Sequence, residues 1–247
     1  MKIVVIGGTG LIGKKLIPHL TAKGHDVLAA SPSKGVNAVT GEGLDAALKG
    51  ADIVVDVANA PAWEDAAVLA FFENSGRNLG AAEKTASVKH HVALSIVNTD
   101  KLPDSGYFRA KAAQEKLIKA SGVPYTILRA TQFMEFVEGI AQSCVEGDVI
   151  HLPAASFQPL ASDDVASALA EVTLKPAKNE TIDLGGPERK PMADFVRELY
   201  AAKGETRKII ADGEGRYFGA KLADTSLVPL GAAMQGRVRF GEWVGKR

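Results

Sequence analysis

The chain has a single cysteine, no excess of charge of either sign, and no apolar run long enough to cross a bilayer. Because Cys144 stands alone, the sequence excludes an internal disulfide and a metal cluster built from thiolates. Lys and Arg number 29, as do Asp and Glu, so nothing indicates a basic groove for nucleic acid or an electrostatic membrane surface. The N-terminal apolar run is too short for the core of a signal peptide. We expect a cytoplasmic protein whose partner is a small-molecule substrate, and the sequence leaves its oligomeric state open.

The composition is otherwise that of an ordinary globular protein. Its 247 residues, 46% hydrophobic and 23% charged, suffice for one large core or for a core with a small lobe. No repeat, low-complexity tract or linker divides the chain. We therefore expect a core over residues 1–130, with residues 131–247 adding further sheet elements and a lobe packed directly on that core.

Short apolar runs alternate with helical patterns along the first 130 residues. This alternation implies right-handed crossovers and a parallel sheet, in an α/β fold of the doubly wound Rossmann type. After residue 130 the pattern loosens, and we expect a small C-terminal substrate lobe there. The expected strands cover residues 3–6, 27–30, 52–58, 91–96, 125–129 and 181–184, with a weaker one near 36–40, and the expected helices cover residues 11–23, 44–49, 64–87 (with a possible break near 74–76), 107–120, 133–143, 162–174 and 192–203.

A glycine-rich turn follows the first strand. Gly8, Gly10 and Gly13 have the spacing G-x-G-x-x-G, and replacing Gly8 by Gly7 gives G-x-x-G-x-x-G. A strand before the turn and a helix after it are the context in which this pattern binds a dinucleotide. Free backbone N–H groups and the positive end of the helix dipole then face the pyrophosphate. The alternative is a glycine-rich turn without a ligand.

The residues after the second strand indicate which dinucleotide binds. An NAD site places a carboxylate there for the ribose hydroxyls. Asp26 precedes the strand and lies at the wrong end, whereas Ser31, Ser33 and Lys34 follow it and offer two hydroxyls and a positive charge. The missing acid favours NADP over NAD, although no Arg is present to bind the 2′-phosphate in a bidentate manner.

Tyr107 and Lys111 lie one helical turn apart on one face of a predicted helix. A neighbouring ammonium favours the phenolate and lowers the pKa of a tyrosine, which suits it to proton transfer in carbonyl reduction. The pair opens the helix that follows the strand ending near Ser95, at the sheet edge where ligands bind. Alternatively, the spacing arises by chance and Lys111 pairs with Glu115. No metal site is expected, because His90 and His91 lack acidic or cysteine partners at ligand spacing.

Together these motifs resemble the short-chain dehydrogenase/reductase superfamily, and most closely its atypical, NmrA-like NAD(P)-binding branch. The resemblance spans residues 1–187. The motifs that carry it are Gly7-Gly-Thr-Gly-Leu-Ile-Gly13, Asn59-Ala-Pro61, Ser95, Tyr107 with Lys111, Ser121-Gly-Val-Pro-Tyr-Thr-Ile-Leu-Arg129, Asp163-Asp-Val-Ala166 and Leu184-Gly-Gly-Pro187.

The resemblance implies an oxidoreductase that passes hydride between nicotinamide and a small carbonyl, alcohol or quinone-like substrate. Tyr107 would be the general acid/base, Lys111 would hold the nicotinamide ribose and tune Tyr107, and Ser95 would orient the substrate oxygen. Residues 216–218 and Trp243 would cover the site. The cofactor, NADP(H) in preference to NAD(H), would contact Gly7, Thr9, Gly10, Leu11, Ile12, Gly13, Ser31, Ser33, Lys34, Ala58, Asn59, Lys111, Thr131 and Phe133.

Two other functions fit the same family. Some NmrA-like proteins bind the dinucleotide as regulators without turning it over, and these lack the tyrosine that this chain has. Epimerases of nucleotide sugars share several motifs, but the short C-terminal region here argues against so bulky a substrate.

Overall fold

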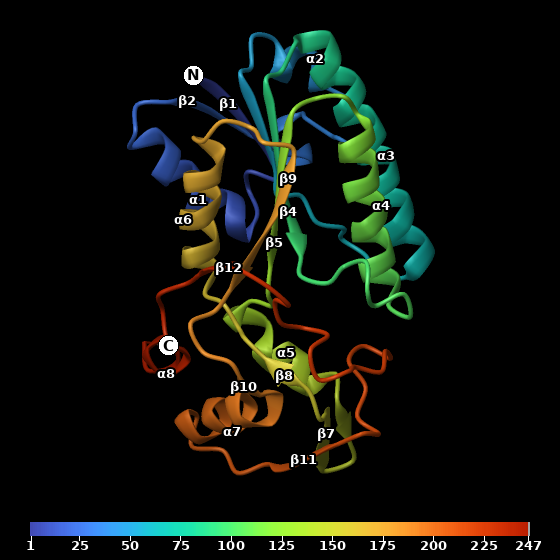
Figure 1. The fold of residues 1–247 in the computed structure, drawn as a ribbon, viewed down its shortest axis with the longest axis vertical. Helices are drawn as coiled ribbons and strands as arrows, with labels where there is room; N and C mark the ends of the chain where they lie inside the picture. Colours follow the sequence, from blue (N-terminus) through green and yellow to red (C-terminus); the bar gives the residue numbers. More distant parts are fainter. Residues whose placement is uncertain (247) are drawn as a thin grey trace.

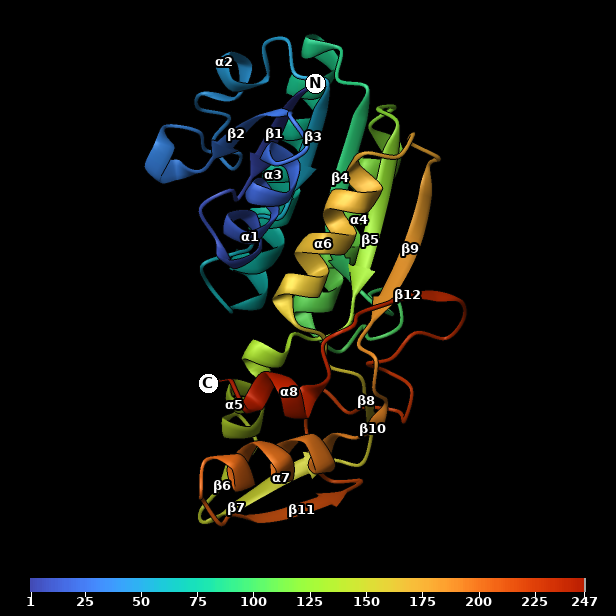
Figure 2. The ribbon, with the colours of Figure 1, turned by 90° about the vertical axis from the view of Figure 1, so that its left-hand side faces the viewer.

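A computed structural model describes residues 1–246 and contains the expected α/β fold (Figures 1 and 2). Seven strands, all paired in parallel, form the main sheet. The Rossmann-type doubly wound sheet is therefore confirmed. In spatial order the strands are β2 (Asp26–Ala30), β1 (Lys2–Ile6), β3 (Ile53–Asp56), β4 (His90–Ile96), β5 (Tyr125–Ala130), β9 (Glu180–Gly185) and β12 (Ala233–Gln235).

Helices cover both faces of this sheet. Helices α1 (Leu11–Thr21) and α6 (Ser162–Thr173) pack together on one face, and α3 (Asp65–Ala86) and α4 (Gly106–Ala120) pack on the other, with α2 (Leu44–Leu48) beside α3 (Figure 1). Because side chains alternate along a strand, Ile3 and Val5 join the core under α1, and Val4 joins the core under α2 and α3. Burial on both faces explains why the first strand is an unbroken apolar run.

The order of the strands reverses beside β1. The chain moves outward from β1 to β2 and then crosses back to β3 on the other side of β1. At such a reversal the crossovers diverge over opposite faces and leave room at the carboxyl ends of the strands. These ends point toward a smaller lobe built mostly from the second half of the chain (Figure 2). The glycine turn lies at this reversal, because it directly follows β1.

Two local predictions are wrong. Residues 36–40 form turns instead of a strand, because the Asn37 side chain accepts the N–H of Val39 and the Asn78 amide binds the carbonyls of Ala38 and Val39. The helix over residues 64–87 has no break and runs as α3 from Asp65 to Ala86. Gly76 instead provides space for α4, since a Cβ there would lie 3.0 Å from the Leu117 side chain.

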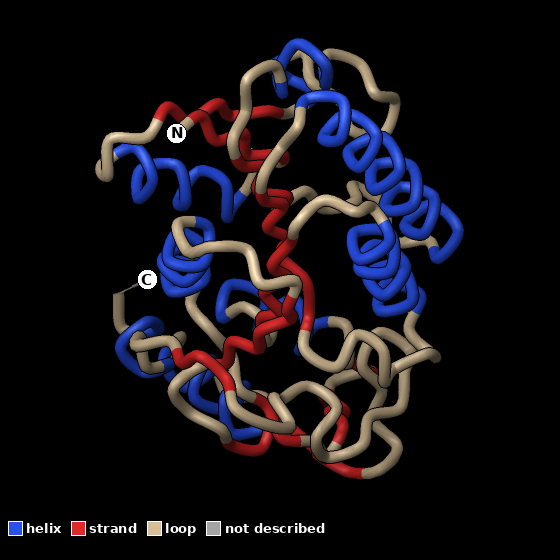
Figure 3. Tube along the Cα trace, turned by 45° about the horizontal axis from the view of Figure 1, so that its top comes forward, coloured by secondary structure: helices blue, strands red, loops and turns tan. Residues whose placement is uncertain are grey.

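The smaller lobe has its own apolar core, which includes Phe157, Phe195 and Phe240 and extends to Leu102 and Phe108 of the first half. The lobe therefore packs directly on the sheet domain, and Figure 3 shows loops joining the two parts. No helix within residues 1–246 is long and apolar enough to cross a membrane. The lobe consists of α5 (Val137–Gln142), β6 (Val145–Glu146), β7 (Val149–Pro153), β8 (Ser156–Phe157), β10 (Lys190–Pro191), α7 (Met192–Ala202), β11 (Lys208–Asp212) and α8 (Phe240–Val244).

Candidate dinucleotide-binding and catalytic site

The glycine turn is tightly packed between β1, its neighbouring strands and α1. A Cβ on Gly7 would lie 2.8 Å from the Ala58 backbone, and one on Gly13 would lie 2.5 Å from the Gly7 carbonyl oxygen. Gly7 also has a left-handed φ of +79°, which favours glycine. These glycines bring the start of α1 directly over the end of β1.

The start of α1 fits a pyrophosphate. Gly10 is the N-cap of α1, and its carbonyl accepts the N–H of Lys14 at 3.0 Å. The N–H groups of the first helical turn therefore have no acceptor four residues earlier within the helix. Gly10 and Leu11 are exposed and Thr9 is half-buried, whereas the Ile12 side chain is buried in the sheet core. Leu11 and Ile12 can therefore contribute backbone N–H groups to an anion, as the motif predicts.

Ser31, Ser33 and Lys34 lie beside this turn, because the Ala30 carbonyl at the end of β2 accepts the N–H of Gly7 at 2.9 Å. The two serine hydroxyls are 3.0 Å apart, and Lys34 is exposed. Asp26 is the first residue of β2 and lies beside Lys2, the first residue of β1, at the opposite end of the sheet, as expected from the sequence. The structure thus brings two hydroxyls and an ammonium to the position where a ribose carboxylate partner would stand in an NAD site.

Tyr107 lies in the first turn of α4 and reaches the loop after β3. Its hydroxyl donates to Oδ1 of Asn59 at 2.6 Å, and its ring contacts Phe72 edge-on. Burial raises the pKa of Tyr107 to about 12, and the Asn59 hydrogen bond only partly offsets this rise. The expected lowering of this pKa by Lys111 is thus wrong for this structure, and the Tyr107 hydroxyl keeps its proton at neutral pH.

Lys111 is buried on the same side of α4. Its Nζ donates to the Leu94 carbonyl at 2.8 Å and to Gln114, and it lies 4.5 Å from the centre of the Phe72 ring. Burial lowers its pKa to about 8, although the carboxylates of Asp56 and Glu115 act in the opposite direction. Tyr107 and Lys111 therefore both contact the Phe72 ring, and each makes a hydrogen bond to a different protein group. The role of Lys111 toward the nicotinamide ribose stays a prediction.

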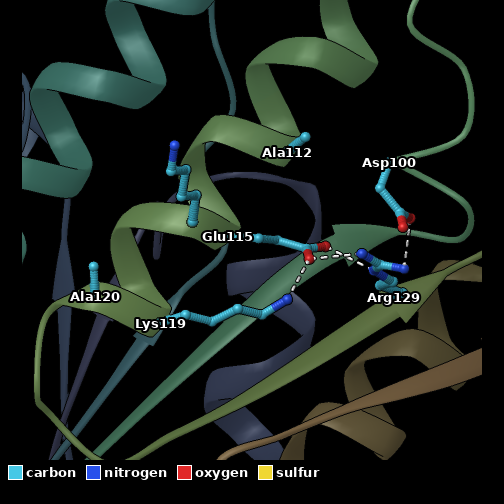
Figure 4. Close-up of a pocket in the computed structure, with 7 residues that line it drawn as sticks. Asp100, Ala112, Glu115, Lys119, Ala120 and Arg129 are labelled. Carbon is cyan, nitrogen blue, oxygen red and sulfur yellow. Dashed lines mark hydrogen bonds and ion pairs between the residues drawn. The ribbon is translucent and has the colours of Figure 1, made fainter.

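Ser95 belongs to a different polar cluster. Its hydroxyl donates to Oε1 of Glu115 at 2.7 Å, and Glu115 also binds Arg129, which pairs with Asp100. An open pocket of about 450 Å³ lies here against α4, and none of the predicted site residues lines it (Figure 4). Ser95 is 3% exposed, so its hydroxyl is enclosed in this cluster. Its role toward the substrate oxygen stays a prediction that this geometry does not favour.

The segment after β5 carries a polar group that sequence analysis missed. Thr131, predicted to bind cofactor, uses its hydroxyl to bind the Gln158 carbonyl at 2.6 Å, and Phe133 stacks on Phe136. Gln132 between them is 9% exposed, and neither polar atom of its amide makes a hydrogen bond of good geometry, although the amide is close enough to the Tyr217 hydroxyl to lower the pKa of that group. Such a buried amide can still bind a ligand or a water molecule. No spacing in the sequence could have shown how this amide is surrounded.

Aromatic side chains from both halves of the chain surround Tyr107. Trp63, in the loop before α3, lies 6.0 Å from the Tyr107 ring and stacks on Phe218 of the lobe. Tyr217 is buried beneath Phe218, and burial raises its pKa well above the ordinary value, with Tyr107 and Gln132 both close enough to affect it. Residues 217 and 218 thus lie against the site, as the family layout implies, whereas Trp243 stacks on Phe240 in the lobe.

The adjacent histidines are structural. Nδ1 of His91 lies 2.6 Å from Oε1 of Glu83, and Nε2 of His90 lies 2.9 Å from the Thr126 hydroxyl. Sequence analysis missed the acidic partner of His91 because Glu83 comes from α3. Within residues 1–246 no three His, Cys, Asp or Glu side chains are grouped so as to hold a metal ion.

Comparison with known proteins places the chain in a family. A profile described as NAD(P)H-binding matches residues 7–176, so the chain belongs to this family, which is an atypical branch of the short-chain dehydrogenase/reductases. The predicted superfamily and its NAD(P)-binding character are confirmed.

Two curated relatives illustrate the range of the family. A (4-alkanoyl-5-oxo-2,5-dihydrofuran-3-yl)methyl phosphate reductase from Streptomyces griseus is 29% identical over 80% of this chain and 73% of its own length. The photosystem II assembly factor Ycf39 of Cyanophora paradoxa is 24% identical over 85% of this chain and 71% of its own length. Among solved structures, a short-chain dehydrogenase/reductase superfamily protein from Agrobacterium tumefaciens with bound NAD matches with a TM-score of 0.76. That match has 16% identity, covers 100% of this chain and 95% of the other, and shows the shared fold.

Proposed function

We propose that this protein is an NADP(H)-preferring reductase of small carbonyl or quinone-like compounds. The observation that carries the proposal is the Tyr107 hydroxyl, which stays protonated at neutral pH and stands near the carboxyl edge of a sheet that binds NAD(P)H. The Streptomyces relative, a reductase, supports the same class of reaction.

The groups at this edge of the sheet have separate roles in the proposed reaction. The cofactor, when bound at the glycine turn, supplies the hydride. Asn59 orients the phenol in the resting site by accepting its hydroxyl proton at 2.6 Å. In the reaction that hydrogen bond is released, and Tyr107 donates the same proton to the substrate oxygen as the carbonyl carbon is reduced, giving an alcohol. Solvent then returns a proton to the phenolate. At neutral pH the phenol carries its proton, which is the form that reduction requires, although its pKa of about 12 makes it a weaker acid than a free tyrosine.

The 2′-phosphate of NADPH would bind at the end of β2. Ser31 and Ser33 donate hydrogen bonds to it, and Lys34 balances its charge. A carboxylate here would repel the phosphate, and none is present in the segment from Ala30 to Lys34.

The test is NADPH consumption against a panel of carbonyls and quinones. Tyr107→Phe should reduce turnover by about 10²-fold or more while leaving NADPH affinity unchanged, because only the proton donor is lost. Tyr125→Phe, at the far end of β5, is the matched control. In the same assay Lys34→Ala should weaken NADPH but not NADH binding, and Lys23→Ala should change neither. Equal turnover by wild type and Tyr107→Phe on every substrate would refute the enzyme proposal.

A second function, binding of the dinucleotide without turnover, is favoured by one observation. Lys111 binds the Leu94 carbonyl and Gln114, and Tyr107 has a raised pKa, so the expected activation of the phenol is absent in this structure. Ycf39, a curated relative, is described as an assembly factor. NADPH binding with no consumption above the Tyr107→Phe level would support this alternative.

A further inference from the structure

Two of the largest exposed apolar side chains face each other next to Tyr107. Trp63 is 71% exposed and Phe218 is 56% exposed. Single exposed apolar residues are ordinary, but these two come from the sheet domain and from the lobe and stack with planes 5° apart and ring centres 6.4 Å apart. The Trp63 ring also lies 6.0 Å from that of Tyr107. The pair therefore forms an apolar surface beside the proposed proton donor.

The backbone holds Phe218 in an unfavourable conformation to keep its ring there. Its φ of 45° is in the left-handed region, which costs a bulky side chain free energy. The turn is closed by two 2.9 Å hydrogen bonds between the backbones of Tyr217 and Ala220, and the buried Tyr217 ring lies beneath it. A strained, exposed aromatic residue at a site is typical of ligand contact.

We propose that Trp63 and Phe218 form an aromatic clamp that selects substrates with a flat, conjugated ring over non-planar aliphatic carbonyls. This inference rests on the proposed reductase function and names its substrate class. Both rings are nearly parallel and largely exposed, so a flat ring can stack on them at about 3.5 Å and contact them over its whole face. A saturated, non-planar ring makes fewer such contacts and gains little from the faces of the indole and phenyl groups.

The amide of Gln132 lies close to the hydroxyl of Tyr217, the residue before Phe218, but makes no hydrogen bond of good geometry. A flat substrate that carries carbonyl oxygens would give the N–H groups of this amide an acceptor. The clamp and the amide together fit a quinone-type ring, in which conjugated faces and carbonyl oxygens occur in one molecule.

The test compares tetramethyl-1,4-benzoquinone with cyclohexane-1,4-dione, two six-membered rings with two carbonyls that differ in planarity. Trp63→Ala and Phe218→Ala should each raise the KM for the quinone about tenfold and leave the KM for NADPH and for the dione unchanged. Phe218→Tyr should retain the wild-type KM, which shows that the ring matters. Leu230→Ala, at another exposed apolar residue of the lobe, is the control. An unchanged quinone KM in both alanine variants, or an equal rise for both acceptors, would overturn the clamp while leaving the reductase proposal intact.

Binding can be measured even if no acceptor is reduced. The chain has two tryptophans, so Trp243→Phe leaves Trp63 as the only fluorophore of that kind. Titration of the quinone into this variant should quench Trp63 saturably, and adding Phe218→Ala should weaken the apparent affinity about tenfold. Saturable quenching without NADPH consumption would support the clamp and refute the reductase. Quenching that is linear and unaffected by Phe218→Ala would overturn the clamp.

Discussion

At the scale of single residues, Lys111 carries a charge that its surroundings oppose. Burial lowers its pKa from 10.5 to about 8, which corresponds to a cost of about 3 kcal/mol for the charged form in the folded protein. Between pH 8 and 10.5 the unfolded lysine keeps its proton and the folded one releases it, so the cost disappears as the pH rises.

We expect Lys111→Met to change stability in a pH-dependent way. The free energy of unfolding of the variant minus that of the wild type should be larger, meaning a relatively more stable variant, at pH 7 than at pH 10 by about 3 kcal/mol. The lost bonds to Leu94 and Gln114 add an offset that does not depend on pH, so the difference between the two pH values is the informative quantity. Urea denaturation of both proteins at the two pH values measures it. If the difference in free energy of unfolding between variant and wild type did not depend on pH, burial of the charged Lys111 side chain would not destabilise the protein.

At the scale of elements, a buried ion pair joins α3 to β4. Burial disfavours the charged form of His91, but the adjacent Glu83 carboxylate outweighs this and raises the His91 pKa. The pair therefore stabilises the protein below pH 6.5, and this contribution is lost as the pH rises through the folded pKa. His90 behaves oppositely, because burial lowers its pKa to about 4. Its neutral form fits the folded protein, so the free energy of unfolding decreases as the pH falls from 6.5 toward 4.

Glu83→Gln separates these two effects. The substitution leaves His91 buried without a counter-charge, so we expect it to cost about 3 kcal/mol at pH 6 and less at pH 9, because the contribution of the pair decreases as the pH rises above 6.5. Thermal and urea unfolding at both pH values provide the comparison. Glu73→Gln, on the exposed face of α3, should have a small effect at either pH. A larger loss at pH 9 than at pH 6 would contradict a charged His91.

Some of the helices and strands can be predicted from the sequence alone, and others cannot. Buried strands such as β1 and the glycine turn were predictable, because β-branched runs and glycine spacing report local requirements. Strands β8 and β10 were not, since each has two residues that pair only with the other. Ser95 was placed correctly at a strand end, yet Glu115, one turn beyond Lys111 on α4, holds its hydroxyl. Contacts between distant segments decide which polar groups remain free for a ligand, and spacing does not record them.

At the scale of the whole molecule, Asn98 joins the edge of the sheet to the segment that connects the lobe to β12. Asn98, just after β4, has a left-handed φ of 55° and donates its side-chain amide to the carbonyls of Thr225, Ser226 and Val228, the last at 2.8 Å. The segment it holds leads on to β12 in the main sheet. The clamp residue Phe218 precedes this segment, so the position of Asn98 affects how the lobe meets Tyr107.

Asn98→Gly tests this connection, because glycine accepts the left-handed backbone and removes only the side-chain hydrogen bonds. We expect a loss of about 2 kcal/mol in the free energy of unfolding and faster amide hydrogen exchange in residues 217–228, with exchange in β1 and β3 unchanged. Asn98→Ala should lose about 1 kcal/mol more, because it also strains the backbone. The KM for a flat acceptor should rise in both variants, whereas NADPH affinity should not change, since the side-chain hydrogen bonds of Asn98 go to residues 225–228 and not to the glycine turn. Faster exchange spread evenly over the sheet would show that Asn98 supports the whole fold and does not specifically fasten the lobe.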